Sequence, residues 1–229
     1  MTNISLVRIG GVSAILAFVS FAAGGIVYFA GVEQVDSDDL AQVLTAVNDS
    51  RAASLTATWI VLAGYVLLIP AALGLFHALQ EAGAVVLIAA AAMFTGTLLF
   101  MGAAIISLGI IDQLAPGYAE ASDVTRPALM VMASTLDRIN DIANDAGLLL
   151  LPGIGVPLFA LVIIRTSIMP SWVGWLAFPA AIVEWLSTLE PVLGAQGALS
   201  GVSFVLFMVW MLVMGVVLVR LREPVAPSG

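Results

Sequence analysis

The residues best suited to chemistry lie in one stretch, 134–145, which reads Ser-Thr-Leu-Asp-Arg-Ile-Asn-Asp-Ile-Ala-Asn-Asp. In a helix, which turns about 100° per residue, this stretch has one polar side and one apolar side. The polar side, here called the polar stripe, contains Ser134, Asp137, Arg138, Asn140, Asp141, Asn144 and Asp145. Such a stripe either meets bulk water, as an extension of a helix, or lines a water-filled vestibule inside a helix bundle.

The oxygen atoms of the polar stripe could also ligate a hard cation, because carboxylates and amides recur at helical spacing. The sequence has no Asp-x-Asp-x-Asp loop, however, and carboxylates on a helix usually meet water. We therefore predict no metal site. Arg138, Asp141, Asn144 and Asp145 are candidates for binding a ligand or an ion.

Glu184 is the fifth candidate, because it stands alone in an apolar stretch. It follows Pro170 by 14 residues, or about 21 Å in a helix, which places it inside a hydrocarbon core about 30 Å thick. An ionised carboxylate there costs roughly 2–3 kcal/mol, so the group must be protonated, paired or hydrated. It is either one half of a structural pair or a proton or ligand site. We expect it to join the polar stripe in one cluster.

Two prolines stand five residues apart in the sequence Leu151-Pro152-Gly153-Ile154-Gly155-Val156-Pro157. Neither proline can donate a backbone hydrogen bond, and the glycines loosen the helix between them. The pattern predicts loss of regular helical hydrogen bonding between Leu148 and Gly155. A break of this kind exposes backbone groups to a ligand in many transporters, and the alternative is a packing bend. Pro70 and Pro179 are interpreted as packing bends.

Other chemistry is poorly supported. His77 is the only histidine and there is no cysteine, which excludes bis-histidine haem, three-histidine zinc and thiol sites. Met208, Met211 and Met214 are interpreted as packing residues rather than copper ligands. The sequence has no nucleophile elbow, phosphate loop or dinucleotide fingerprint. We therefore predict a protein that is not an enzyme, with no catalytic residues and no cofactor.

These residues must be positioned by membrane helices. The 229 residues are 62% hydrophobic and only 10% charged, with a mean hydropathy of +1.13, and such a chain cannot cover a water-facing surface. A span needs about 20 apolar residues. The sequence predicts an all-α bundle of six transmembrane helices in a single domain, 1–229, with spans at about 9–31, 56–79, 84–111, 142–164, 172–189 and 198–219.

The arginines predict the orientation of the bundle, because cytoplasmic loops hold the positive charge. Arg8, Arg165 and Arg220 adjoin span ends on one side, whereas most acidic residues fall on the other. Both termini are therefore predicted to be cytoplasmic. In the first outer loop, Leu40, Val43, Leu44 and Val47 recur at helical spacing after Ser37, a possible cap. A short amphipathic helix is expected there, either packed on the bundle or bilayer or serving as a lid.

Several segments together resemble a family of small bacterial multi-pass membrane proteins catalogued as a domain of unknown function (number four-three-eight-six). They are Arg8-Ile9-Gly10-Gly11, the first outer loop with its helix, the second span with its short turn, and residues 158–175. In the last segment Arg165-Thr166-Ser167 ends one span, and Met169-Pro170-Ser171-Trp172-Val173-Gly174-Trp175 opens the next. The resemblance implies a six-helix membrane fold and no activity.

We expect a multi-pass protein of a bacterial plasma membrane that is not an enzyme. It would be an accessory or interaction subunit, or would bind a small apolar ligand between its helices. The alternative is a small proton- or cation-coupled transporter that uses the polar outer end and broken middle of the fourth span. The expected partners are the lipid bilayer and either a second membrane protein or another copy of the chain. Nucleic acid is excluded, because there is no basic patch and the net charge is −8.

Overall fold

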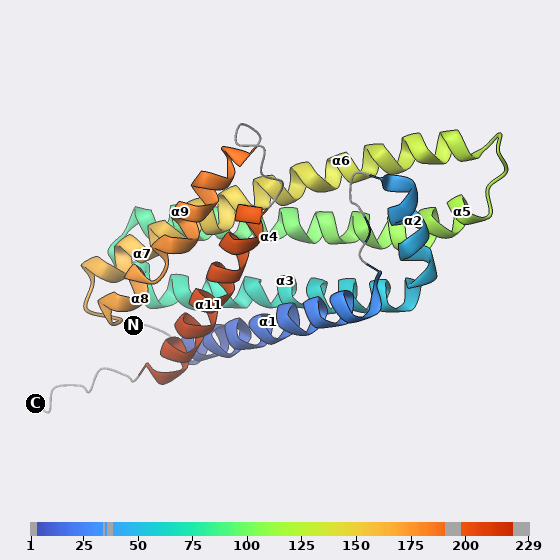
Figure 1. Cartoon of the computed structure of the whole chain (residues 1–229). Coiled ribbons are helices and arrows are strands. Elements are labelled where there is room, and N and C mark those ends of the chain that lie inside the picture. The colour runs from blue at the N-terminus through green and yellow to red at the C-terminus, as the bar shows by residue number, and fades with distance from the viewer. Residues whose placement is uncertain (1–3, 34, 36–38, 191–197, 222–229) are drawn as a thin grey trace, which may run out of the picture. The chain divides into compact units, whose positions relative to one another are not determined.

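The computed structural model describes residues 4–33, 35, 39–190 and 198–221, which form helices joined by short turns, with no strand among them (Figure 1). The long helices are α1 (Ile4–Gly31), α3 (Arg51–Leu79), α4 (Ala84–Gly109), α6 (Arg126–Leu150) and α11 (Ala198–Arg220). The shorter ones are α2 (Leu40–Asp49), α5 (Ala115–Ala119), α7 (Val156–Arg165), α8 (Ser171–Trp175) and α9 (Phe178–Ser187). A 3₁₀ turn, Gln80–Ala82, and two π-helical turns, Ile110–Leu114 and Leu151–Gly155, complete the described elements.

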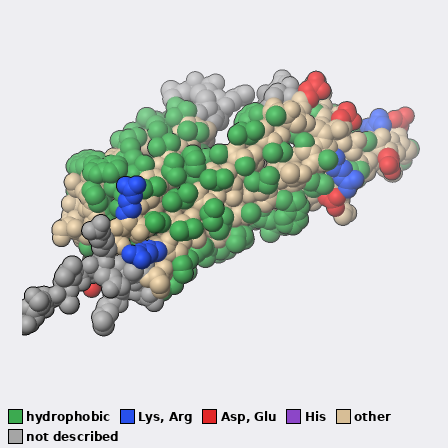
Figure 2. Space-filling model, turned by 90° about the horizontal axis from the view of Figure 1, so that it is seen from below, with side chains coloured by type: hydrophobic (Ala, Val, Ile, Leu, Met, Phe, Trp, Pro, Cys, Tyr) green, Lys and Arg blue, Asp and Glu red, His purple; other side chains and the backbone are tan. Residues whose placement is uncertain are grey.

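Among the described residues, five helical segments are long and apolar enough to cross a membrane. They are Ser5–Gly31, Arg51–Ala82, Ala84–Ala119, Arg126–Arg165 and Leu199–Arg220. Each contains most of one predicted span, so five of the six predicted spans have a matching helix. Figure 2 shows the surface expected of such helices, because hydrophobic side chains cover most of the face in view. This is the architecture of a multi-pass membrane protein.

The remaining predicted span, 172–189, is not one continuous helix. It is divided into α8 and α9, which have 5 and 10 residues, fewer than the ~20 that a single spanning helix needs. Pro179 is the second residue of α9. It has no N–H to donate to the Trp175 carbonyl, and its ring would clash with that group in a continuous helix. Leu176 and Ala177, which separate α8 from α9, keep helical backbone angles, so the interpretation of Pro179 as a packing bend stays a prediction. Pro70 lies inside the uninterrupted α3.

The predicted loss of regular helical hydrogen bonding in the fourth span is confirmed only in part. Residues 151–155 form a π-helical turn, in which the Val156 N–H donates to the Leu151 carbonyl, and α6 continues through it into α7. Leu150, Gly155 and Val156 all keep helical backbone angles. Regular α-helical hydrogen bonding is thus replaced rather than lost. A π-helical turn accommodates one extra residue per turn, which relieves the missing proline donors without opening the helix.

The chain divides into two compact units, and the boundary falls within α1, α3, α4 and α6. Unit 1 comprises Met1–Phe18, Leu67–Thr97 and Gly147–Gly229, and unit 2 comprises Val19–Val66 and Leu98–Ala146. The two units share these four helices, and the single domain stays a prediction.

Unit 1 is packed through small residues. A Cβ atom on Gly10 of α1 would lie 2.5 Å from the Gly74 Cα of α3, and one on Gly11 would lie 2.7 Å from the Gly215 carbonyl of α11. The backbones of these helices therefore touch, as small residues permit in membrane proteins. At the other side of α11, Trp210 Nε1 donates to the Val173 carbonyl of α8 at 3.0 Å, and α11 lies beside α9 (Figure 1).

Unit 2 holds the amphipathic helix predicted for the first outer loop, and α2 confirms that helix. Its N-cap is Asp39, whose carboxylate accepts hydrogen bonds from the Ala41 and Gln42 amides at 3.1 and 3.2 Å. The predicted cap, Ser37, lies outside the described residues. The buried Leu44 and Val47 pack in a cluster with residues of the π-helical turn Ile110–Leu114, α5 and α6. The helix thus covers the bundle through its apolar side.

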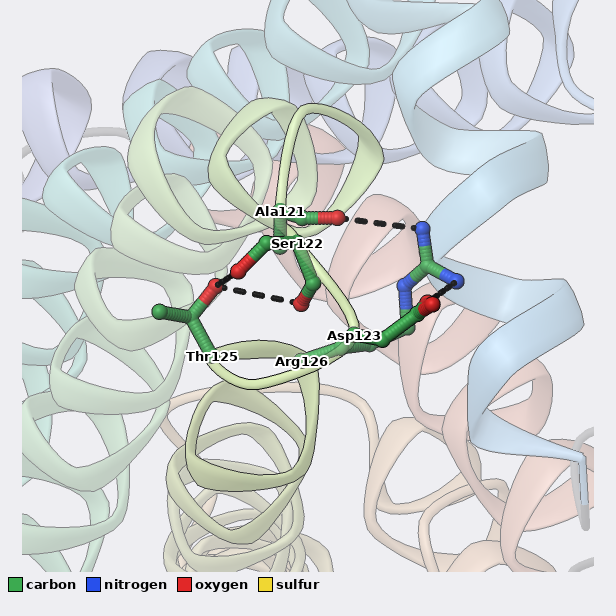
Figure 3. Close-up of polar contacts among 5 residues, drawn as sticks. All are labelled: Ala121, Ser122, Asp123, Thr125 and Arg126. Atoms are coloured by element: carbon green, nitrogen blue, oxygen red, sulfur yellow. Dashed lines mark hydrogen bonds and ion pairs between the residues drawn. The ribbon is translucent and has the colours of Figure 1, made fainter.

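The turn before α6 is fixed by local polar contacts (Figure 3). The Ser122 carbonyl accepts from the amides of Thr125 and Arg126 at 3.0 and 2.9 Å. The Arg126 side chain donates to the Ala121 carbonyl at 3.2 Å and pairs with Asp123 at 3.6 Å. These contacts set where α6 begins, and with it the position of the polar stripe.

Candidate functional site

Unit 2 contains a cavity of about 270 Å³, here called the unit 2 cavity. Its walls come from α1, α3, α4 and α6, so segments far apart in the sequence meet there. The lining combines three kinds of side chain. Small residues make the space, aromatic rings form one part of the lining, and amides and hydroxyls form another.

The space exists because small residues face it. Gly24, Gly25, Ala57, Ala103 and Ala104 all line the cavity. Gly24 allows α1 to approach α3, because a Cβ atom there would lie 2.6 Å from Val61 Cγ2. At Gly25 an added Cβ would meet no atom within 4 Å. Gly24 is therefore used for packing, and Gly25 leaves room.

An aromatic stack forms one part of the lining. The rings of Tyr65 and Phe100 lie parallel, with centroids 5.1 Å apart and an interplanar angle of 2°. Phe21 packs against the same tyrosine with a centroid distance of 5.0 Å and a tilt of 59°. All three side chains are buried. Such rings present a flat, rigid apolar surface to whatever occupies the cavity.

The polar part of the lining comes from the polar stripe of α6. Asn140 and Asn144 line the cavity together with Ser107 of α4, whose hydroxyl donates to Asn140 Oδ1 at 3.3 Å. An asparagine amide can both donate and accept hydrogen bonds. Of the five candidate residues, Asn144 is thus the one that lines this cavity.

The other members of the polar stripe lie differently. Arg138, Asp141 and Asp145 are exposed. Three charged side chains of the stripe are thus exposed, whereas its two amides line the unit 2 cavity. The described residues contain no group of three or more histidine, cysteine, aspartate or glutamate side chains that could hold a metal ion.

Glu184 lies on α9 in unit 1 and is only 3% exposed. The Ser187 hydroxyl donates to the Glu184 carbonyl at 2.7 Å and lies 3.3 Å from Oε1 of the carboxylate. Across the helix interface, a Cβ atom on Gly153 would lie 3.3 Å from Glu184 Cγ. The carboxylate thus packs beside the π-helical turn. The expected cluster of Glu184 with the polar stripe stays a prediction, because the other four candidates belong to unit 2.

The sequence interpretation missed Tyr65, Phe100 and Ser107 as lining residues. A partial signal existed, since Gly24-Gly25 indicates a close helix approach and Asn140 belongs to the polar stripe. Which of these helix faces meet depends on the rotation of four helices about their axes. That information is absent from the periodicity of any one of them.

Comparison with known proteins gives one finding that covers almost the whole chain. No curated protein and no solved structure matches it. A family model described as "Domain of unknown function (DUF4386)" matches residues 9–221, which confirms the resemblance found in the sequence. The chain therefore belongs to this family of domains of unknown function.

Proposed function

We propose that the protein is a multi-pass membrane protein that binds a small neutral ligand in the unit 2 cavity and does not act as an enzyme. The observation that carries this proposal is the pairing of the Tyr65–Phe100 stack with the Asn140–Asn144 amide edge in one cavity. Ligand sites are typically apolar with a few placed polar groups. The lining residues supply amides and hydroxyls rather than carboxylates or imidazoles, which suits binding better than acid–base catalysis.

The cavity also indicates the chemistry of its ligand. Its volume of about 270 Å³ is nearly twice the ~150 Å³ that accommodates benzene in an engineered apolar cavity. Its lining carries no formal charge, so it offers a charged ligand no opposite charge to pair with. The best fit is a neutral molecule of about two rings, stacked on the aromatic side chains, with a hydroxyl or carbonyl that meets the amides.

The test uses 2-naphthol, which has two fused rings and one hydroxyl. Gly25→Leu adds bulk to a lining position, and its Cβ displaces no neighbour, because an added Cβ there meets open space. Gly102→Leu is the matched control, since that glycine lies in α4, also meets open space and does not line the cavity. Titration calorimetry on protein in detergent is expected to show saturable binding to the wild type and to the control. Binding to Gly25→Leu is expected to be at least tenfold weaker.

Two outcomes of this titration would overturn the proposal. One is equal binding to all three proteins, which would mean that naphthol partitions into the detergent or onto the outer surface. The other is an absence of saturable binding to the wild type. Size-exclusion chromatography of each variant shows whether the substitution disturbs the fold.

We also propose six membrane crossings, with α8 and α9 together forming the fifth in chain order. Ile182, Trp185, Leu186 and Leu189 support this, because all are about half exposed along one apolar segment. An even number of crossings puts Arg8, Arg165 and Arg220 on the same side, which is cytoplasmic under the positive-inside rule. The corresponding location is a bacterial plasma membrane.

Proton coupling is a second candidate function, favoured by Glu184. A carboxylate that is 3% exposed and packed beside a π-helical turn is an unusual feature in an apolar helix pair, and intramembrane carboxylates often belong to proton pathways. Proteoliposomes with an internal pH dye would show proton uptake that is lost in Glu184→Gln and kept in Glu81→Gln. Equal uptake by both variants would contradict this candidate.

A further inference from the structure

A second cavity, of about 250 Å³, lies wholly in unit 1, between the start of α4 and the end of α7. We call it the unit 1 cavity. Its lining is divided by type. Ala82, Val85, Leu158, Leu161 and Val162 form an aliphatic part, and Arg165 and Thr166 form a polar part.

The polar part contains two donors that no described residue uses. Arg165 is the exposed last residue of α7, and no described carboxylate lies within ion-pair distance of its guanidinium. Thr166 Oγ1 is buried and has no hydrogen-bond partner among the described residues. The backbone explains their placement, because the chain becomes extended at Thr166 while its amide still donates to the Val162 carbonyl at 3.0 Å. A buried hydroxyl and a neighbouring guanidinium together form a donor pair suited to an anion.

The aliphatic part runs from these donors along two helices. Val85 and Leu161 are 39% and 37% exposed, so the lining opens to the surroundings of the protein rather than being enclosed. In a membrane protein those surroundings are acyl chains. An occupant of this cavity would therefore have an anionic end at Arg165 and an aliphatic chain along α4 and α7.

We propose that the unit 1 cavity binds one anionic phospholipid. Its phosphate accepts hydrogen bonds from the Arg165 guanidinium and, after rotation of the Thr166 side chain toward the cavity, from the Thr166 hydroxyl. One acyl chain lies against Val85, Leu158 and Leu161. Free phosphate is a poorer occupant, because a single arginine at an exposed helix end offers little charge and the aliphatic lining would stay unused. A zwitterionic lipid is also poorer, because its own tethered cation competes with Arg165 for the phosphate.

The test is native mass spectrometry of the full chain in mild detergent, after incubation with an equimolar mixture of phosphatidylglycerol and phosphatidylcholine. The wild type is expected to retain one phosphatidylglycerol in preference to phosphatidylcholine. Arg165→Gln is expected to lower that retention at least tenfold. Arg220→Gln is the matched control, since Arg220 is also an exposed arginine that ends a helix but does not line the cavity, and it should behave as the wild type.

The role of the Thr166 hydroxyl is tested with its own variants, so that the result does not depend on Arg165→Gln alone. Thr166→Val removes the hydroxyl at nearly constant shape and is expected to lower retention several-fold, whereas Thr166→Ser keeps the hydroxyl and should restore it. Inorganic phosphate added in excess is expected not to displace the lipid. Displacement would assign the site to free phosphate and overturn the proposal. Two further results would also overturn the proposal. One is that Arg165→Gln and Arg220→Gln lower phosphatidylglycerol retention equally, and the other is that the wild type retains both lipids equally.

Discussion

The indole Nε1 of Trp185 donates a hydrogen bond of 2.9 Å to the carbonyl oxygen of Gly153. In a regular α-helix that carbonyl would accept from the amide four residues later, which is position 157. Pro157 has no N–H, so the donor must come from elsewhere. A side chain of α9 thus replaces the hydrogen bond that a proline removes from the helix around the π-helical turn Leu151–Gly155.

The first prediction concerns this replacement. Trp185→Phe keeps an aromatic ring but leaves the buried Gly153 carbonyl without its side-chain donor, and is expected to lower the free energy of unfolding by about 1–2 kcal/mol. Trp172→Phe is the control, because Trp172 is 55% exposed and its indole donates to no described residue. Chemical denaturation in detergent, followed by circular dichroism, measures both variants.

A double-mutant cycle sharpens this prediction. Pro157→Ala restores an amide that can donate to Gly153, so Trp185→Phe should cost less in that background than in the wild type. Strictly additive effects would show that the indole hydrogen bond and the missing proline donor are unrelated.

The second prediction separates glycines that packing requires from glycines that it does not. Gly10→Ala places a Cβ atom 2.5 Å from a backbone atom of Gly74, so α1 and α3 must move apart. We expect a loss of about 1–3 kcal/mol. Gly102→Ala meets no atom within 4 Å and should be neutral, or stabilising by up to about 1 kcal/mol because alanine favours helix. Similar thermal stabilities of the two variants would contradict the close approach of α1 and α3.

The third prediction concerns the amide edge of the unit 2 cavity. Asn140→Leu keeps the branching of the side chain, in a larger volume, but replaces an amide that hydrogen-bonds Ser107 with a hydrocarbon. The affinity for 2-naphthol is expected to fall relative to that for naphthalene by about tenfold, which corresponds to about 1.4 kcal/mol. Asp141→Asn is the control, since that neighbouring carboxylate is exposed and lies outside the lining. An unchanged ratio in Asn140→Leu would show that the ligand hydroxyl does not meet this amide.

Much of the fold could be predicted from apolar length alone. The runs that became α1, α3, α4, α6–α7 and α11 exceed the ~20 residues that a span needs, and helical periodicity was enough to predict α2. Pro179 and Pro157 were harder to interpret, because the effect of a proline depends on whether another group supplies or replaces the missing hydrogen bond. At Pro157 the donor is Trp185, 28 residues away in sequence, and no local pattern indicates it.

The candidate site was predictable only in part, for a similar reason. The polar stripe identifies Asn144, but the cavity that gives this residue a role also needs Tyr65 and Phe100 from two other helices. Stacking of those rings at 5.1 Å is a property of how α3 and α4 are rotated toward each other. Glu184 stands out in the sequence because an ionised carboxylate is energetically costly in an apolar stretch. Its contacts with Ser187 and Gly153 are visible only in the structure.

The last prediction decides between five and six membrane crossings. The chain contains no cysteine, so single cysteines report position without background labelling. Ser167, before α8, and Thr188, after α9, are both exposed, and Ser167→Cys and Thr188→Cys bracket the divided segment. If α8 and α9 together cross the membrane, a membrane-impermeant maleimide applied to spheroplasts labels Thr188→Cys and not Ser167→Cys. Ser122→Cys, in the turn before α6, should then be labelled like Thr188→Cys, because two crossings separate the two positions.

Labelling of Ser167→Cys and Thr188→Cys from the same side would mean that α8 and α9 enter and leave by one face. In that case five crossings would remain, and the two termini would lie on opposite sides.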